Sequence, residues 1–243
     1  MLIVLPPSET KAHGGDGAPL NWDSLSFASL AAQRRSIAAD LAGLPVDEAL
    51  GILGISEKLR PEAEENTRLF SGPTMPAIER YTGVLYDALD APSLPPAARE
   101  RLAVGSALFG VVRAGDMIPH YRLSAGTKLP DADGNLPTMK SRWGKTITRA
   151  LSEVDGLVID LRSGGYQQLG PCPGALTVRV ESVREDGSRK VVSHFNKHYK
   201  GELARVLALS DAAPTDAASV AEVAREAGMT VEENSPTQLT LVV

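Results

Sequence analysis

Apolar and polar positions along the chain fall into blocks that predict strands and helices in alternation. Residues 1–5 form a short apolar run that predicts a buried strand, and residues 157–161 form a second apolar run with one acid, typical of a central strand covered on both faces. Between them, apolar residues at 27, 30, 31, 37, 38 and 41 predict a helix over 26–41. The alternation indicates an α/β fold.

The same patterns predict the remaining elements. Helices are expected to begin near Pro45 and at Ser56 (a candidate N-cap), to cover 77–89, to begin near Thr138, and to cover 196–209 and 217–227. Strands are expected over 175–183, 190–195, 229–232 and 239–243, with a hairpin at 185–188 joining the first two. Because no repeat or soft linker divides the chain, we expect one domain over 1–243, with a mixed sheet surrounded by helices.

The composition limits the class of protein and its cellular compartment. With 43% hydrophobic and 23% charged residues, the usage is that of an ordinary globular protein. The single cysteine, Cys172, excludes an intramolecular disulfide and a cysteine-based zinc site. The opening apolar run is too short for a signal peptide or a membrane span, so we expect a cytoplasmic protein that does not enter a membrane. The net charge of −5 is unlike that of a dedicated nucleic-acid binder, although a local basic face is compatible with it.

Polar residues directly follow the first predicted strand. Ser8, Glu9, Thr10 and Lys11 come after Leu5-Pro6-Pro7. Open α/β sheets usually present their sites at the carboxyl ends of their strands, so this segment is a candidate site. The alternative is a solvated turn after an edge strand.

A second candidate segment runs from Gly105 to Gly126. It contains Ser106, Arg113, Asp116, Tyr121 and Arg122 without amphipathic spacing. The two arginines could clamp a carboxylate or phosphate, with the aspartate orienting one of them. The alternative is an internal Arg–Asp network that fixes an irregular loop.

A third candidate segment, 193–201, lies at a predicted strand-to-helix junction, where backbone N–H groups favour anions. It supplies Lys197 and Lys200, and Arg205 follows one turn later. Residues 106–150 also hold seven basic residues against three acids. The basic residues are Arg113, Arg122, Lys128, Lys140, Arg142, Lys145 and Arg149. This local excess indicates an anionic partner.

Familiar nucleotide and hydrolase signatures are absent. The chain has no Gly-x-x-x-x-Gly-Lys-Ser/Thr loop, no Gly-x-Gly-x-x-Gly after a strand and no Gly-x-Ser-x-Gly elbow. The four histidines, at 13, 120, 194 and 198, are scattered, and although His194 and His198 are four apart, they need not share a face. We therefore expect surface and loop histidines, no metal site and no cofactor.

Taken together, these segments resemble the YaaA family, the bacterial peroxide stress proteins, whose biochemical activity is unknown. The opening strand and its Ser/Pro-rich continuation, Met1–Thr10, match the family's start. The longest matching block runs from Ser106 to Gly126 and reads Ser-x-Leu-Phe-Gly-Val-x-Arg-x-x-Asp-x-x-x-x-Tyr-Arg-Leu-x-x-Gly. The other matches, in chain order, are Trp143-Gly144, then Leu161 with Ser163 and Tyr166, then Ser193 with Lys197, Gly201 and Arg205.

The resemblance implies an unusual α/β fold with a helix-hairpin-helix element, a positively charged cleft and binding of double-stranded DNA. It also implies a role in peroxide survival through limiting unincorporated iron. The helix-hairpin-helix would fall on 46–70, with Gly54, Ser56, Lys58 and Arg60 as its DNA-binding residues. Residues 47–70 carry six acids and three bases, so Coulomb repulsion opposes phosphate binding there. Clustered histidines and carboxylates are lacking in the sequence, so any effect on iron is expected to be indirect.

Two functions of different class follow. In the first, a non-enzymatic stress protein holds duplex DNA in a basic cleft lined by Arg113, Arg122, Lys145 and Lys197. In the second, the same cleft is the active site of an enzyme for a small anionic substrate, nucleotide-like or carboxylate-like. Its expected catalytic residues are Lys11 or Lys197 as base or nucleophile, Glu9 as acid or base, and Tyr121 as a hydrogen-bonding partner. Its expected ligand-binding residues are Ser8, Thr10, Ser106, Arg113, Asp116, Arg122, Lys145, Ser163, Lys197, Lys200 and Arg205. The oligomeric state is left open.

Overall fold

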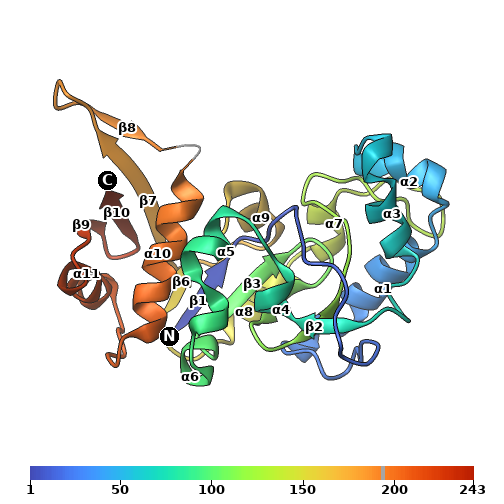
Figure 1. Cartoon of the computed structure of the whole chain (residues 1–243), viewed down its shortest axis with the longest axis horizontal. Coiled ribbons are helices and arrows are strands. Elements are labelled where there is room, and N and C mark those ends of the chain that lie inside the picture. Colours follow the sequence, from blue (N-terminus) through green and yellow to red (C-terminus); the bar gives the residue numbers. More distant parts are fainter. Residues whose placement is uncertain (193–194) are drawn as a thin grey trace.

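A large, mostly parallel sheet forms the centre of the molecule in the computed structural model, which describes residues 1–192 and 195–243. In the described residues its strand order is β4-β3-β1-β6-β7-β10-β9, with β8 paired to the outer part of β7. The strands from β3 to β10 in this order run parallel, whereas β4, β8 and β9 pair antiparallel to their neighbours. Helices flank the sheet (Figure 1).

The bounds of the elements are as follows. The strands are β1 Leu2–Leu5, β2 Thr74–Pro76, β3 Leu102–Ser106, β4 Gly110–Arg113, β5 Met117–Pro119, β6 Val158–Asp160, β7 Leu176–Val183, β8 Arg189–Val191, β9 Thr230–Ser235 and β10 Gln238–Val242. The α-helices are α1 Ala31–Ala42, α2 Val46–Leu53, α3 Arg60–Asn66, α4 Ala77–Arg80, α5 Val84–Leu89, α6 Pro96–Arg99, α7 Met139–Trp143, α8 Thr146–Ser152, α9 Gly164–Leu169, α10 Asn196–Leu209 and α11 Ala217–Glu226. Short 3-10 turns cover Ala28–Leu30, Glu57–Leu59 and Ala91–Ser93, and β2 and β5 form a separate two-stranded sheet.

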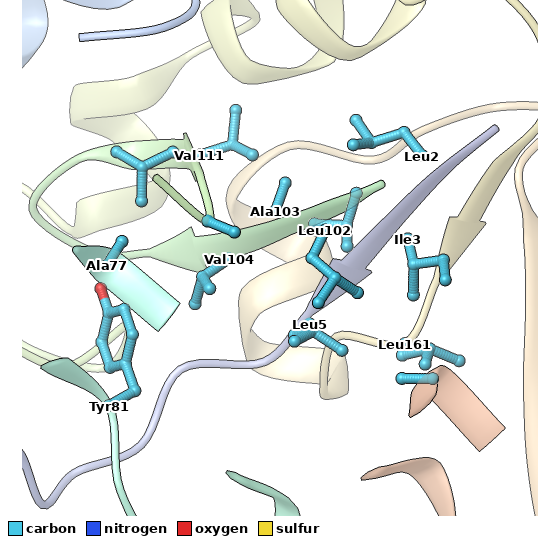
Figure 2. Packing of buried hydrophobic residues seen from close by; sticks show 14 of the residues in the cluster. Leu2, Ile3, Leu5, Ala77, Tyr81, Leu102, Ala103, Val104, Val111 and Leu161 are labelled. Atoms are coloured by element: carbon cyan, nitrogen blue, oxygen red, sulfur yellow. The ribbon is translucent and has the colours of Figure 1, made fainter. Parts of the chain in front are cut away.

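The core is built around β1, whose four residues are all buried. This strand lies between β3 and β6, with Ile3 opposite Leu102 on one side and Ile159 on the other. Its uninterrupted apolar sequence fits a strand covered on both faces. Figure 2 shows its side chains packed with those of β3. Because β1, β3 and β6 run in the same direction, the segments that follow them emerge at one edge of the sheet, which we call the carboxyl edge.

On one flank, α10 packs against α5 and β7. The close approach to α5 depends on Gly201, because a Cβ there would lie 2.3 Å from the carbonyl oxygen of Leu85. The helices α2 and α3 lie at one end of the molecule, and the β7–β8 hairpin lies at the other (Figure 1). None of the helices in the described ranges has the length and apolar character that a bilayer span requires.

The structure confirms most of the predicted elements, including β1, β6, α10, α11 and the closing pair β9–β10. The predicted strand over 190–195 is β8, which ends at Val191, and Ser193 and His194 lie outside the described residues. The single helices predicted over 77–89 and from Thr138 onward are wrong as single helices. The first is broken at Tyr81–Gly83 and the second at Gly144, and both glycines have positive φ. Ser56 precedes its helical turn but makes no side-chain cap.

Candidate functional site

The ammonium group of Lys11 lies inside the protein at the carboxyl edge. The residue follows β1 by six positions and is only 7% exposed. Its Nζ donates to the backbone oxygen of Ser8 at 2.9 Å and lies 4.4 Å from the ring centre of Tyr121 and 5.5 Å from that of Tyr81. A buried lysine that faces two aromatic rings and two carbonyls, those of Ser8 and Glu9, is an unusual structural element, because cations are rarely buried without a carboxylate partner.

A chain of hydroxyl groups continues from the lysine into the core. The hydroxyls of Tyr81 and Tyr121 lie 2.8 Å apart, and that of Tyr121 lies 2.7 Å from Ser106 Oγ. Ser106 in turn accepts a hydrogen bond from the backbone N–H of Phe109 at 3.0 Å. All three hydroxyl residues are buried. The chain is therefore fixed at its inner end by the backbone of Phe109, which helps to hold the two tyrosine rings in position around Lys11.

Burial shifts the proton affinities of this cluster. Desolvation lowers the pKa of Lys11 from 10.5 to about 8, opposed by the nearby Glu9 carboxylate and assisted by Arg122. Desolvation also raises the pKa of Tyr81 to about 12 and raises the pKa of Tyr121 well above 10. The tyrosines therefore stay protonated near neutral pH and are available as hydrogen-bond donors.

A charged pair forms the outer rim of the cluster. The guanidinium of Arg122 donates to the backbone oxygen of Glu9 at 3.0 Å and lies 3.1 Å from the Glu9 carboxylate. The backbone of Arg122 is itself held by Asn66 of α3, whose side-chain amide accepts from its N–H at 2.8 Å and donates to its C=O at 3.0 Å. We call the group of Lys11, Tyr81, Tyr121, Ser106, Glu9 and Arg122 the Lys11 site.

Further polar residues surround the Lys11 site. Ser8 and Thr10 hydrogen-bond to each other through their hydroxyls at 3.1 Å. Ser163, exposed, directly precedes α9 at the end of β6. Tyr166 of α9 is close enough for its charge to couple to that of Glu9, and burial raises its pKa. The structure thus brings the predicted residues of the first segment, 8–11, together with Ser106, Tyr121 and Arg122 of the second. Ser163, which follows β6, lies at the same carboxyl edge.

Arg113 and Asp116 lie at the other end of the sheet. Arg113 pairs with Ala103 at the start of β3, whereas Ser106 at the end of β3 belongs to the Lys11 site. The Arg113 guanidinium donates to Glu100 O at 3.0 Å and lies over the Phe27 ring. Asp116 accepts from the backbone of Arg113 and from Ser26. Arg113 and Arg122 therefore do not converge on one anion, and Asp116 fixes a turn.

The remaining predicted basic residues are dispersed. Lys145, exposed, is the N-cap residue of α8, and Lys197, also exposed, lies in the first turn of α10. Lys200 is buried and donates to Leu161 O at 3.2 Å. Arg205 donates to Leu89 O at 2.9 Å and so holds the end of α5. Lys200 therefore ties α10 to the segment after β6, and Arg205 ties it to α5.

The segment predicted as a helix-hairpin-helix consists of α2, a turn at 54–59 and α3. Gly54 ends α2 in the left-handed conformation, with φ of 64°. Arg60 is engaged by Glu57 and, at 2.8 Å, by Asp47, and Ser56 and Lys58 are exposed. A groove beside the turn is lined by the end of α2 and by residues 124–128, including the exposed Lys128. The acids of this segment therefore pair with two of its three basic side chains, Arg60 and, through Glu65 at 3.9 Å, Arg68.

Several residues of the site escape sequence reasoning. Tyr81 and Asn66 were assigned to helices and carried no motif, and Arg80 was equally inconspicuous. Arg80 is fully buried and donates to the backbone oxygens of Ala12, Gly14 and Ile118, which fixes the loop after Lys11. The one available signal was composition, since the chain has only five tyrosines. The structure also brings His13 and His120 together beside the carboxylate of Glu62, a set of possible metal ligands that the sequence did not predict.

The chain is similar to one protein family over most of its length and to several bacterial proteins. A family model described as "Peroxide stress protein YaaA" matches residues 1–234. A UPF0246 protein of Corynebacterium efficiens is 69% identical over 245 residues, covering 100% of both chains. A UPF0246 protein of Streptomyces coelicolor is 43% identical over 247 residues, covering 97% of this chain and 94% of its own. An uncharacterized protein of Campylobacter jejuni is 28% identical over 219 residues, covering 86% and 85%.

Proposed function

This chain belongs to the peroxide stress protein YaaA family, and we propose that it is an enzyme that binds a small anionic molecule at the Lys11 site. The substrate class is nucleotide-like or carboxylate-like. In this proposal the protein works in the cytoplasm during peroxide stress, and its effect on free iron follows from the reaction. The name of the family supports a role in peroxide stress, and the residues of the Lys11 site support a reaction on a bound anion.

One observation carries the proposal, namely that the site already holds a carboxylate. Glu9 places its side chain 3.1 Å from Arg122, beside the buried amine of Lys11. The carboxylate belongs to an exposed residue of a loop, so a substrate carboxylate or phosphate can replace it at the guanidinium. Lys11 and Arg122 are neighbouring cations that act on each other electrostatically, and together they favour an anion over a neutral molecule.

The surrounding groups suit a reaction at the bound molecule. Lys11 is the group placed to accept a proton from the substrate or to attack it, because its amine is the innermost basic group of the site. Tyr121 is held through its hydroxyl by Tyr81 and Ser106, and so presents a fixed ring to the amine of Lys11. Glu9, once displaced from Arg122, becomes available as an acid or base. Ser8, Thr10 and Ser163 supply hydroxyls at the rim.

Arginine 122 is expected to be required for anion binding. Arg122→Gln should weaken binding of AMP or succinate by about 10–100-fold, because a charge-assisted hydrogen bond contributes about 1.5–3 kcal/mol. Glu9→Gln should tighten binding, since it removes the competing carboxylate. The measurement is isothermal titration calorimetry with inorganic phosphate, AMP and succinate as probes.

The matched control is Arg113→Gln, which removes the other arginine of the same sequence block from the opposite end of the sheet. It should leave probe binding unchanged. Failure of all three probes to bind, or equal losses in the two arginine variants, would contradict the proposal.

Duplex DNA is a second candidate ligand, at a different place. The supporting observation is the turn between α2 and α3, where Gly54 is left-handed and the exposed Lys58 and Lys128 flank the same region. Backbone N–H groups of such a turn can face a phosphate, with lysines in support. Glu57 and Asp47 hold Arg60 and oppose this binding.

Lysine 58 provides the test of the DNA candidate. If the turn binds duplex DNA, Lys58→Gln should weaken binding and lower the slope of log K against log salt by about 1. Fluorescence anisotropy with a labelled duplex over a salt series measures both quantities. Lys190→Gln, an exposed lysine on β8 at the far end of the molecule, is the matched control (Figure 1). Absence of binding at about 50 mM salt excludes this candidate.

A further inference from the structure

Three metal-ligating side chains from distant parts of the sequence meet beside the Lys11 site. His13 lies in the loop after β1, Glu62 lies on α3, and His120 directly follows β5. His13 Nε2 lies 3.6 Å from Glu62 Oε1, and His120 Nε2 lies 3.6 Å from Glu62 Oε2. Each imidazole therefore faces its own oxygen of one carboxylate, and the ligand atoms all lie within 4.8 Å of one another.

Buried polar atoms of this cluster have no hydrogen-bond partner. His120 is only 4% exposed, and among the described residues neither of its ring nitrogens is within hydrogen-bond geometry of an acceptor or donor. Glu62 Oε2 is buried and unsatisfied in the same way. Buried groups of this kind ordinarily find a partner, because leaving one unmade costs about 1–3 kcal/mol. Two unsatisfied groups that face each other indicate a missing third species between them.

An ordinary ion pair does not explain the arrangement. In such a pair the imidazole nitrogen and the carboxylate oxygen approach to about 2.7–2.9 Å. A direct hydrogen bond would also bring the atoms closer than 3.6 Å. The distances instead leave a gap between the nitrogens and the carboxylate.

We propose that His13, Glu62 and His120 bind one divalent first-row transition metal ion. Two imidazoles and one carboxylate are the ligand set of Zn²⁺ and Fe²⁺ sites, and three protein ligands leave coordination positions open. With metal–ligand bonds of about 2.0–2.2 Å, ligand atoms of one ion lie at most about 4 Å apart. The present 4.8 Å limit therefore requires only a small inward movement.

The required movement is available to one of the histidines. The rings of His13 and His120 are stacked, with centroids 4.5 Å apart and planes 9° apart, so their lone pairs cannot both point at one ion without a tilt. The side chain of His13 is 64% exposed and lies in a loop, whereas that of His120 is 3% exposed. We therefore assign the tilt to His13, with His120 and Glu62 as the fixed ligands.

The charges and ligand atoms around the site favour a transition metal ion over a hard ion such as Mg²⁺. Lys11 and Arg80 are cations that act electrostatically on His120. Arg80 is saturated by backbone oxygens, and the Glu62 carboxylate compensates part of the added positive charge. Hard ions such as Mg²⁺ prefer several oxygen ligands, so a site with two nitrogens and one carboxylate should discriminate against them.

Titration of the untagged, metal-free full chain tests the site. Isothermal titration calorimetry with Zn²⁺ should show one ion per chain, and Co²⁺ should give visible d–d absorption at the same stoichiometry. Glu62→Gln, which is isosteric, and His13→Ala, in an exposed loop, should each weaken Zn²⁺ binding by at least about 100-fold. Mg²⁺ should not compete. Zn²⁺ should also raise the unfolding temperature of the unaltered chain but not that of Glu62→Gln.

The matched control is His198→Ala. His198 and Glu202 form a second His–Glu pair at 3.3 Å, but both side chains are more than 40% exposed, and this pair should not contribute to the titration. The proposal is overturned if the unaltered chain does not bind Zn²⁺. It is equally overturned if Glu62→Gln and His13→Ala bind as the unaltered chain does, or if His198→Ala removes the binding.

Discussion

Replacing Arg162 by methionine should lower the free energy of unfolding by about 3–5 kcal/mol. Its side chain is 1% exposed and donates to both carboxylate oxygens of Asp160 at 2.8 Å and to Gly170 O at 2.9 Å. Asp160 ends β6 in the centre of the sheet and is itself buried. The substitution leaves the buried charge of Asp160 with the backbone N–H of residue 162, at 3.1 Å, in place of the guanidinium. Chemical denaturation followed by circular dichroism measures the loss.

Two controls distinguish the loss of the Arg162–Asp160 pair from the general effects of removing an arginine. Arg35→Met breaks an Arg–Asp pair of similar length, 2.7 Å, with Asp23, but there the side chains are 44% and 79% exposed, so the loss should be about 0–1 kcal/mol. The double substitution Arg162→Met with Asp160→Leu should recover part of the stability, because no unpaired charge remains. Equal losses in Arg162→Met and Arg35→Met would contradict the assignment.

Replacing Lys11 by methionine should remove function while sparing the fold. Methionine has a similar length, packs well against aromatic rings and needs no desolvation of a charge. The unfolding temperature should therefore stay the same or rise. Binding of AMP or succinate should weaken by about 10–100-fold, since the amine that faces the anion is lost. Calorimetric titration gives the binding change, and a thermal melt gives the stability.

Lysine 197 is the matched control for this substitution. The sequence offered Lys11 and Lys197 equally as the reactive lysine, and the structure places the second at the exposed start of α10. Lys197→Met should leave probe binding unchanged. If Lys11→Met unfolds the protein, the buried lysine is a structural element. If Lys197→Met instead removes binding, the site lies elsewhere.

The sequence was sufficient to predict the elements whose structure depends on hydrophobic patterning. The runs at β1 and β6 have the composition of strands covered on both faces, and both form the centre of the sheet. The amphipathic helix α10 also has the predicted bounds, Asn196–Leu209. The position of Ser8–Lys11 at the carboxyl edge followed from the strand before it. These features depend on local periodicity and on one general rule of open sheets.

Where tertiary contacts decided the structure, the sequence misled. Arg113 and Arg122 are nine residues apart, but Arg113 ends β4 and the chain then turns and runs through β5, which sends Arg122 to the other end of the sheet. Tyr81 was assigned to a continuous helix. In the structure the helix stops there, where Tyr81 pairs with Lys11 and Gly83 takes a positive φ. This break is what places a tyrosine against the lysine.

The histidine cluster shows the same limit. Sequence reasoning looked for histidines four apart, and the ligands at 13, 62 and 120 come instead from three separate segments. Their convergence depends on Asn66, which ties α3 to Arg122, and on Arg80, which ties the loop after Lys11 to Ile118. Neither of these hydrogen-bonded links has a signature in a single sequence.

A crystal structure of the protein with AMP tests the central claim most directly. The Lys11 site predicts the phosphate group within hydrogen-bond distance of both Arg122 and Lys11, with the Glu9 side chain displaced from the guanidinium. A phosphate bound at Arg113, or at the turn between α2 and α3, with Glu9 still on Arg122, would contradict the claim.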